Sequence, residues 1–590
     1  MNIFDNILLN KKKIKEKLLS SRDNFLEKKV AILTGSTIDL LKDTLEIYLL
    51  YHGIKPTFYI SEYNKYYEDA VFENLALDEF KPDIVYIFTT FRNINVDIDI
   101  NFSKEEIDSL LENEYNKYKN IWESLIKKYN PVIIQNNFEY PNFRLLGNND
   151  IVNVHGLSNF INKLNYKFYE YAEENNIHIL DINYIASDFG LSKWHNNKLY
   201  ALYKIPCDIE AIPQIAFNAA NIIKSVYGKN KKLLALDLDN TLWAGVVSED
   251  GLNGIEIGKE TAIGELYYDF QNYIKKLKSI GVLLSIVSKN DEDVALEAIE
   301  KSDGVLKKDD FVDIKANWQP KNENIKKISE ELNLGIDSFV FIDDNPMERD
   351  IVKTSFNQIE VPDIKDVDEY INAIDKAGFF ENTIITKEDL EKTKNYQKNL
   401  AINEYKSNIT NYDDYLDSLD MKAIILPFEE KYFDRISQLS NKSNQFNLTT
   451  KRYSVEDIKN IASDKNHITL YGKLDDKFGE NGIVSLIIGK IIDTANGKEL
   501  NIDLLLMSCR VLKRDMEYAM MDELVRLCIE KNIDIINGFY YKTEKNNMVS
   551  DLYEKYGYDI IKNEDNEKIY RLTNLKNYQN KNKHILVNKF

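Results

Sequence analysis

Short apolar runs alternate with helical patterns over the first third of the chain. Residues 29–35 form an apolar run that ends at a glycine, and the next apolar residues recur at helical spacing up to Gly53. Similar runs begin at Pro82, Pro131 and Ile177. Strands that alternate with helices predict a parallel sheet covered by helices. Residues 1–28 precede this pattern and predict an amphipathic helix packed on its own protein.

The same alternation returns over residues 230–375, with apolar runs at Leu233–Leu236, Gly281–Val287 and Ser338–Ile342. Further on, strands of antiparallel type mix with a helix over Met516–Lys531, which is typical of an α+β domain. The chain is therefore predicted to be a multidomain α/β protein. Its parts are domains at residues 1–225, 226–375 and 421–575, a helical connector at 376–420 and a loose Asn/Lys-rich tail at 576–590.

Composition narrows the class of protein. Of the 590 residues, 44% are apolar and 12% aromatic, which is typical of folded domains. The formal net charge of −20 argues against a nucleic-acid partner, which would require a basic surface. With only three cysteines, a disulfide framework is excluded and a reducing cytoplasm is expected. No apolar run approaches about 18 residues, and the start places apolar before basic residues, so we expect neither a membrane span nor a signal peptide.

Carboxylates follow two of the strands predicted in the middle domain. Asp237 and Asp239 come after the run Leu233–Leu236, and the pair Asp343-Asp344 comes after Ser338–Ile342. Ligands of open α/β sheets bind beyond the carboxyl ends of the strands. Acids gathered there repel one another unless a cation lies between them, and Mg²⁺ prefers oxygen ligands. The sequence therefore predicts a Mg²⁺ site.

A hydroxyl and an ammonium complete the pattern. Ser288 closes the strand that starts near Leu283, and Lys321 lies between it and the second acid pair. A carboxylate nucleophile, Mg²⁺ and donors for phosphoryl oxygens are what phosphoryl transfer requires. Thr241 could cap the following turn, but we favour a buried support for the acids.

In their order, these motifs resemble the haloacid dehalogenase (HAD) phosphotransferase superfamily. The resemblance implies that Asp237 is the nucleophile and that Asp239 is the general acid/base, which also offers its backbone carbonyl to Mg²⁺. It implies that Ser288 and Lys321, with Thr241, bind the phosphoryl group. The metal ligands that it implies are Asp237, Asp239, Asp343 and Asp344.

Longer stretches of the sequence resemble a narrower family within this superfamily. Residues 236–251, 317–325 and 338–349, followed by 435–450, 478–484 and 507–512, resemble the FkbH-like family of HAD subfamily IIIC. Members of that family take a three-carbon unit from 1,3-bisphosphoglycerate, dephosphorylate it and load the glyceryl group as a thioester on an acyl carrier protein. The resemblance covers residues 29–572 and implies a small phosphorylated substrate and a carrier-protein partner.

Cys509 is the cysteine that fits this chemistry. It follows an apolar strand and stands beside Arg510, whose charge would lower the thiol pKa and attract a phosphate. We hypothesise that Cys509 carries the glyceryl group transiently; the alternative is a buried, inert thiol. Cys207 and Cys528 are interpreted as core residues.

The C-terminal domain also resembles the GNAT acyltransferase fold. Residues 510–515 would be its pyrophosphate loop, with Lys513 and Asp515 in place of the usual glycines. Glycines let backbone N–H groups approach phosphates, so this replacement argues against coenzyme A. Arg510 and Asn546 are predicted to contact an acyl or pantetheine group.

The first domain resembles the SGNH-hydrolase-like domain that precedes the HAD domain in this family. Ser36 would occupy the nucleophile position and His195 that of the base. However, Ser192 stands where the family has an Asp, so nothing evident orients the imidazole. We expect a non-catalytic scaffold, with Ser36 as a helix N-cap and His195 at the surface or between domains.

Two alternatives to glyceryl loading remain open. One is a phosphatase or phosphotransferase acting on a small metabolite or sugar in glycan or secondary-metabolite biosynthesis, and the other is a non-catalytic assembly protein.

The distribution of charge indicates where a carrier protein would dock. Residues 231–375 hold 17 Lys/Arg and 31 Asp/Glu, whereas residues 421–575 hold 23 Lys/Arg and 25 Asp/Glu. An acidic carrier protein is therefore expected to dock near the C-terminal domain.

Overall fold

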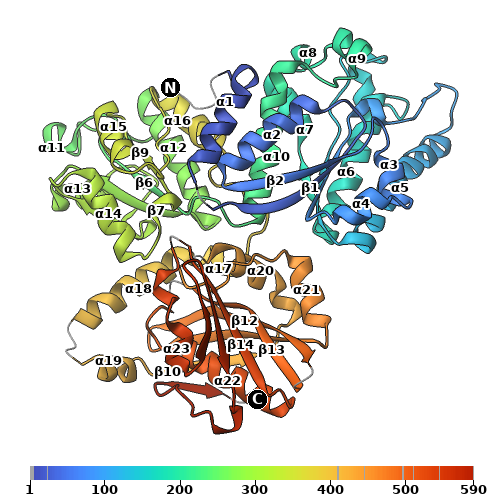
Figure 1. Cartoon of the computed structure of the whole chain (residues 1–590). Coiled ribbons are helices and arrows are strands. Elements are labelled where there is room, and N and C mark those ends of the chain that lie inside the picture. The colour runs from blue at the N-terminus through green and yellow to red at the C-terminus, as the bar shows by residue number, and fades with distance from the viewer. Residues whose placement is uncertain are drawn as a thin grey trace. The chain divides into compact units, whose positions relative to one another are not determined.

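The computed structural model describes residues 6–22, 24–407, 411–443, 445–494, 497–508, 511–543 and 545–588, with the backbone alone for residues 387, 388, 401 and 403–407. The chain divides into two compact units, Met1–Val226 and Tyr227–Phe590 (Figure 1). The first contains one sheet and the second contains two. The prediction of a multidomain α/β protein with parallel sheets is thus confirmed.

The sheet of the first unit has five parallel strands in the order β2-β1-β3-β4-β5. The strands are β1 (Leu26–Thr34), β2 (Ile54–Ile60), β3 (Ile84–Phe88), β4 (Val132–Asn136) and β5 (His178–Leu180). The helices are α1 (Ile7–Ser20), α2 (Asp39–Tyr51), α3 (Tyr66–Val71), α4 (Leu75–Phe80), α5 (Lys104–Tyr129), α6 (Leu157–Asn175), α7 (Ile182–Phe189), α8 (Leu191–Trp194), α9 (Asn197–Tyr203) and α10 (Ile212–Val226). This strand order is that of flavodoxin-like folds, which bind ligands between β1 and β3.

Strand β2 was missed in the sequence. It lies at the edge of the sheet, contains Pro56 and alternates buried with exposed residues at its start. Proline is tolerated in edge strands, where one row of backbone groups needs no partner, so it obscures the strand signal without preventing the strand.

Helix α1 is shorter than predicted, because β1 already begins at Leu26. Its residues Ile14 and Leu18 are buried, and Lys11 and Lys15 pair with carboxylates of α2, the first with Asp43 at 2.7 Å. The helix therefore packs on its own protein, as expected from its pattern.

The first sheet of the second unit has four parallel strands in the order β8-β7-β6-β9. They are β6 (Leu233–Leu236), β7 (Leu283–Ser288), β8 (Asp313–Ala316) and β9 (Phe339–Ile342). The helices of this part are α11 (Val247–Asp250), α12 (Ala262–Ser279), α13 (Glu292–Lys301), α14 (Lys321–Glu331), α15 (Pro346–Ser355) and α16 (Val367–Asp375). The three predicted strands are present, and the short edge strand β8 was missed.

Alternate residues of β6 enter two different cores. Leu234 and Leu236 pack into one cluster, whereas Leu233 and Ala235 pack into another. A strand buried on both faces is apolar without interruption, which is why its end at Asp237 was visible in the sequence.

The predicted connector contains α17 (Lys387–Leu390), α18 (Lys392–Ser407) and α19 (Tyr412–Ser418). Helix α18 is part of the core beside β6: Tyr396 is 6% exposed there, and Leu400 packs against the same cluster. Its Lys392 ammonium and Gln397 amide donate to the carbonyls of Gly281 and Phe311, each at 2.8 Å.

The C-terminal sheet is mixed, with eight strands in the order β15-β16-β14-β13-β12-β11-β10-β17. The strands are β10 (Met421–Leu426), β11 (His467–Asp476), β12 (Gly479–Thr494), β13 (Gly497–Met507), β14 (Ile535–Tyr541), β15 (Asp559–Asn563), β16 (Glu567–Leu572) and β17 (Ile585–Asn588). The helices are α20 (Phe433–Lys442), α21 (Val455–Ser463), α22 (Met516–Glu530) and α23 (Leu552–Tyr556). The tail expected to be loose instead supplies β17, which pairs in parallel with β10. Among the helices that the structure describes, none is long and apolar enough to cross a membrane.

Candidate active site

Three carboxylates meet at the carboxyl ends of β6 and β9. These strands are neighbours, and the N–H of Asp237 continues their pairing by donating to the carbonyl of Ile342 at 3.0 Å. Asp343 and Asp344 follow Ile342 directly. Oxygens of Asp237, Asp343 and Asp344 all lie within 4.8 Å of one another. The structure thus brings together acids that are more than 100 positions apart in the sequence.

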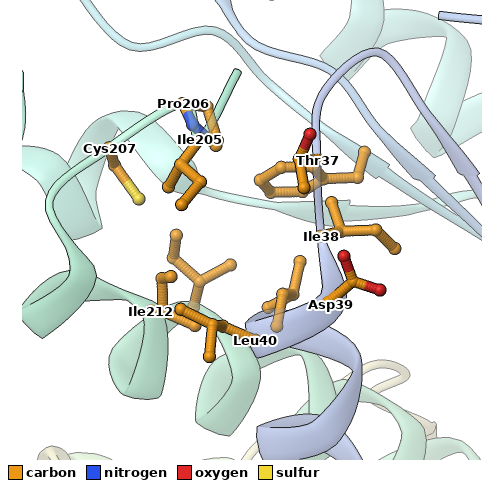
Figure 2. Close-up of a pocket in the computed structure, with 11 residues that line it drawn as sticks. Thr37, Ile38, Asp39, Leu40, Ile205, Pro206, Cys207 and Ile212 are labelled. Atoms are coloured by element: carbon orange, nitrogen blue, oxygen red, sulfur yellow. The ribbon is translucent and has the colours of Figure 1, made fainter. Parts of the chain in front are cut away.

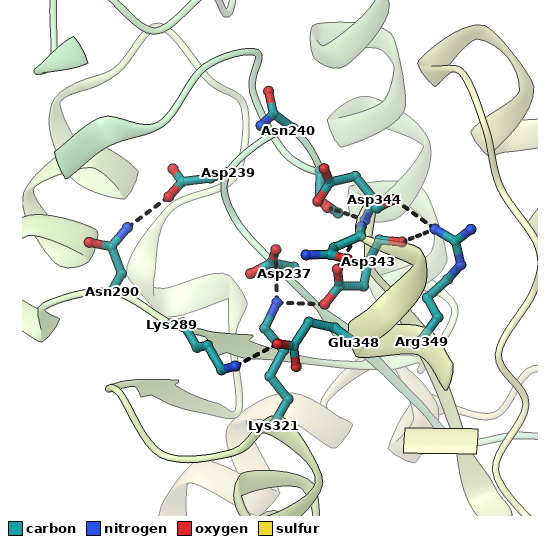
Figure 3. Close-up of polar contacts among 12 residues, drawn as sticks. Asp237, Asp239, Asn240, Lys289, Asn290, Lys321, Asp343, Asp344, Glu348 and Arg349 are labelled. Atoms are coloured by element: carbon teal, nitrogen blue, oxygen red, sulfur yellow. Dashed lines mark hydrogen bonds and ion pairs between the residues drawn. The ribbon is translucent and has the colours of Figure 1, made fainter. Parts of the chain in front are cut away.

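The Lys321 ammonium lies between two of these acids (Figure 3). It is 2.9 Å from Asp237 Oδ2 and 2.5 Å from Asp343 Oδ2, and the side chains of Lys321 and Asp343 are 4% and 0% exposed. Burial alone would lower the pKa of Lys321, but the two carboxylates outweigh it and raise that pKa. The lysine therefore stays charged and partly neutralises the acids.

The donor set fits Mg²⁺. Three carboxylates supply oxygens only, and these lie close enough together for one hard cation to take a ligand from each. Burial, and then the nearby Asp237, raise the pKa of Asp343 to about 7. The same two causes raise the pKa of Asp344. These raised pKa values mean that the positive charge of Lys321 does not fully offset the burial and mutual repulsion of the acids.

Asp239 is held apart from this cluster. Its Oδ1 accepts from Trp243 Nε1 at 2.9 Å and from the backbone N–H of Val247 at 3.0 Å, and its Oδ2 accepts from Asn290 Nδ2 at 3.1 Å. Burial raises its pKa. A carboxyl with a raised pKa suits an acid/base role. Its carboxylate is not among the three that meet; the backbone carbonyl that was assigned to the metal remains a prediction.

Thr241 and Asn240 hold the loop after β6. Thr241 is fully buried, and its hydroxyl accepts from the N–H of Asp344 at 3.2 Å, so it ties the two acid loops together. This contact makes Thr241 a support of the acids, whereas its phosphate contact stays a prediction. Asn240 has a left-handed backbone (φ 53°), and its carbonyl accepts from the hydroxyls of Tyr267 and Tyr370 at 3.1 and 3.2 Å.

Arg349 holds the second acid loop from behind. Its NH1 donates to the carbonyls of Asp343 and Asp344, each at 2.8 Å, and its NH2 pairs with Asp363. No pattern in the sequence indicates this role, because an arginine on a helix does not reveal which carbonyls it reaches.

Ser288 lies at the end of β7, the other neighbour of β6, and is 2% exposed. The next residue, Lys289, forms an ion pair with Glu348 of α15 at 2.5 Å. Neither partner of this pair was singled out in the sequence.

Of the residues predicted in the C-terminal domain, Cys509 and Arg510 lie outside the described residues. Asn546 is fully buried, and its side-chain amide is used inside the protein: Oδ1 accepts from the N–H of Thr543, and Nδ2 donates to the carbonyls of Asn447 and Tyr541. These contacts order a loop, so the structure gives no support to a ligand contact at Asn546.

Lys513 and Asp515 have left-handed backbones, with φ of 61° and 62°. The loop thus has the backbone conformation that glycines adopt easily, although both positions carry side chains. The Arg514 guanidinium between them pairs with the buried Asp476 at 2.7 Å.

The predictions of Ser36 as a helix N-cap and of His195 as a surface residue are wrong. Helix α2 begins at Asp39 with Ile38 as its N-cap, and the buried Ser36 hydroxyl has no hydrogen-bond partner among the described residues. His195 is 8% exposed, and its Nε2 lies 2.7 Å from the carbonyl of Tyr140. Burial lowers the pKa of His195. Local spacing could not reveal that both residues fold inward.

Cys207 is buried, as expected, and lines a mostly apolar pocket between the start of α2, α10 and the end of β3 (Figure 2). Burial raises its thiol pKa far above the ordinary value. Cys528 is also buried, which raises its pKa to about 12. Both thiols are therefore protonated and unreactive at neutral pH.

Residues 29–224 match the family described as FkbH, N-terminal domain. The chain is similar to the N-terminal part of the protein BF1531 from Bacteroides fragilis, which contains a phosphatase domain and was crystallised in complex with Mg. Identity is 27% and the TM-score is 0.59, over 63% of this chain and 99% of that one. This likeness, together with the oxygen cluster, supports the expectation of Mg²⁺. No curated protein matches the chain.

Weaker likenesses concern the C-terminal part. The ribosomal-protein-S18-alanine N-acetyltransferase from Escherichia coli is 10% identical over 26% of this chain, with a TM-score of 0.20. A GNAT-family acetyltransferase from Streptococcus pneumoniae is 14% identical over 26% of this chain, with a TM-score of 0.21. Scores this low do not assign the fold, so both the GNAT-like and the SGNH-like assignments stay predictions.

Proposed function

We propose that the chain is a Mg²⁺-dependent phosphatase or phosphotransferase of the HAD type. The observation that carries the proposal is the buried Lys321 between Asp237 and Asp343, with Asp344 alongside, at the carboxyl ends of adjacent parallel strands. The similarity to a Mg-complexed phosphatase domain supports it. The intact acids count against a purely structural assembly protein.

Asp237 is the proposed nucleophile. Its carboxylate oxygen attacks phosphorus, the bond from phosphorus to the leaving oxygen breaks, and Asp239 gives that oxygen a proton. Water then attacks the aspartyl-phosphate, and Asp239 takes the proton back. Lys321 and Ser288 hold phosphoryl oxygens.

Asp237, Asp343 and Asp344 would hold Mg²⁺, with the Asp239 carbonyl. When bound there, the ion would neutralise negative charge on the phosphoryl oxygens.

Phosphate release from small phosphate esters in the presence of Mg²⁺ tests the proposal. The variant Asp237→Asn keeps the shape of the side chain but lacks the nucleophile, so release is expected to disappear. The matched control Asp269→Asn changes an exposed carboxylate on α12 and is expected to keep wild-type activity. Activity retained in Asp237→Asn would contradict the nucleophile assignment.

We further propose glyceryl loading as the reaction that this site serves. The proposal rests on the resemblance of the motifs and on the match of residues 29–224 to the FkbH N-terminal family. The thiolate of Cys509 would attack the acyl carbon of 1,3-bisphosphoglycerate, with phosphate as the leaving group and a thioester as the product. The Asp237 site would then remove the remaining phosphate, and a cytoplasmic acyl carrier protein would receive the glyceryl group.

Mass spectrometry after incubation with 1,3-bisphosphoglycerate tests the Cys509 step. An adduct is expected on the wild-type chain and not on Cys509→Ala, while Cys528→Ala keeps it. An adduct that persists in Cys509→Ala refutes this step alone. Phosphate release without any carrier-protein adduct favours the simpler metabolite or sugar phosphatase.

A further inference from the structure

Trp318 leaves most of its surface in water beside the phosphoryl site. It is 66% exposed, whereas each of the other three tryptophans of the chain is 1% exposed. Trp318 follows Asn317, whose backbone N–H donates to the carbonyl of Ser288 at 3.1 Å, in the loop between β8 and α14. Lys321 begins α14 directly after this loop. The indole is therefore carried by a short loop that runs between the two residues proposed to hold phosphoryl oxygens.

A hydrogen bond fixes the exposed indole. Trp318 Nε1 donates to Oδ1 of Asp291 at 2.8 Å. Asp291 is the N-cap residue of α13, but its side chain accepts from no N–H of that helix. An Asp at this position ordinarily accepts from the first turn and stabilises the helix. Here the carboxylate holds Trp318 in place of that cap, so the indole keeps a defined position although it is exposed.

Hydrogen bonds also connect Trp318 with the proposed acid/base. The side-chain amide of Asn290 donates to Oδ2 of Asp239 at 3.1 Å, and its oxygen accepts from the N–H of Asp291 at 3.0 Å. Asn290 is 1% exposed, so these contacts are shielded from water. Asp239 is proposed to protonate the leaving oxygen. The organic group attached to that oxygen therefore leaves on the side of the site to which the Trp318 loop is connected.

We propose that Trp318 is a specificity-determining contact, whose indole stacks on a ring in the leaving group of the substrate. Rings pack on an indole by offset stacking or edge to face, and a fixed indole has no conformational freedom to lose on binding. This inference rests on the proposed phosphoryl site and names its substrate class: phosphate esters with a ring beside the phosphate. A glyceryl group has no ring, so the contact belongs to the simpler phosphatase reaction.

Binding of two non-hydrolysable phosphonates tests the contact without turnover. Ethylphosphonate and benzylphosphonate carry the same anionic group, but only benzylphosphonate has a ring. Their Kd values for the full Mg²⁺-loaded chain are measured by calorimetry. The wild type is expected to bind benzylphosphonate about fivefold more tightly than ethylphosphonate, as one stacked ring pair allows.

Quenching of tryptophan fluorescence by acrylamide gives a second readout. Since Trp318 is the exposed one of the four tryptophans, the quenchable part of the emission should come from it and disappear in Trp318→Phe. Benzylphosphonate is expected to protect this emission, whereas ethylphosphonate leaves it quenchable. If the ligand-free wild type shows no quenchable emission, another part of the chain covers Trp318 and the proposed contact is overturned.

Three variants assign the preference to the ring of Trp318. Trp318→Ala removes the ring and is expected to bind both phosphonates alike. Trp318→Phe retains a ring and is expected to keep a preference for benzylphosphonate. Ile351→Ala removes an exposed apolar side chain from α15 and is expected to behave as the wild type. A Mg²⁺-induced thermal shift in each variant shows that the acids are still folded.

The outcomes separate this contact from the phosphoryl site. If the wild type binds both phosphonates equally, or if Trp318→Ala keeps the preference, the contact is refuted and the phosphoryl site stands. If neither phosphonate binds in the presence of Mg²⁺, the phosphoryl site fails and this inference fails with it.

Discussion

Replacing Asp343 by Asn is expected to stabilise the metal-free protein at alkaline pH. The pKa of the Asp343 carboxyl is about 7 in the folded protein, whereas that of an unfolded Asp is about 3.9. Between these values the folded state binds more protons, so its stability falls as pH rises from about 4 to about 7. A difference of about three pKa units corresponds to about 4 kcal/mol. The amide of the variant never ionises and therefore escapes this loss.

Part of that gain is offset. The Asp343 carboxylate also accepts from Lys321 and from the N–H of Asn345, and an amide cannot keep both contacts. One lost hydrogen bond costs about 1 kcal/mol. We therefore expect Asp343→Asn to be about 3 kcal/mol more stable than the wild type at pH 8 in EDTA, and no more stable at pH 5.

Thermal unfolding at pH 5 and pH 8 measures this effect. The unfolding transition of the domain that carries Asp237 is recognised in the wild type because Mg²⁺ raises its temperature. Mg²⁺ has this effect because it binds the acids only in the folded state. The same ion is expected to shift Asp343→Asn less, and the control Asp269→Asn should follow the wild type. The reasoning is refuted if metal-free wild-type stability does not fall between pH 5 and pH 8, or if the variant gains nothing at pH 8.

Three further changes have defined outcomes. Lys321→Met leaves two buried carboxylates unpaired and is expected to reduce phosphate release more than about 100-fold; Lys326→Met, on the exposed side of α14, should not. Asp239→Asn is expected to lower kcat about 10²–10⁴-fold while the Mg²⁺-induced thermal shift remains, and a lost shift would make Asp239 structural. Tyr396→Ala is expected to lower the stability of the Mg²⁺-sensitive transition by about 3–5 kcal/mol, and an unchanged transition would contradict the place of α18 in that core.

The central strands and their acids were predictable from sequence for one reason. Strand β6 is buried on both faces, so it is an unbroken apolar run, and the first acid marks its end. The carboxyl ends of neighbouring parallel strands lie together, so a run ending at Asp237 and another ending at Asp343 predict a shared site.

What was missed depends on contacts between distant segments. The edge strands β2 and β8 are only partly buried, so their apolar signal is weak. The Lys289–Glu348 pair joins residues 59 positions apart. Nothing in the spacing of either residue indicates the other. Ser36 was wrongly expected to cap a helix because α2 begins later than the polar residues suggest.

The position of α18 bears on how the activities of this chain can be separated experimentally. One side of the sheet that carries Asp237 is completed by Tyr396, which comes after the last helix of that domain in the sequence. A fragment that ends at α16 would leave apolar side chains of this core in water. Loss of activity in such a fragment would reflect misfolding, and would not show that the C-terminal sheet takes part in chemistry. Ile402 of the same helix packs into the core of the C-terminal sheet, so a cut after α18 would in turn open that core.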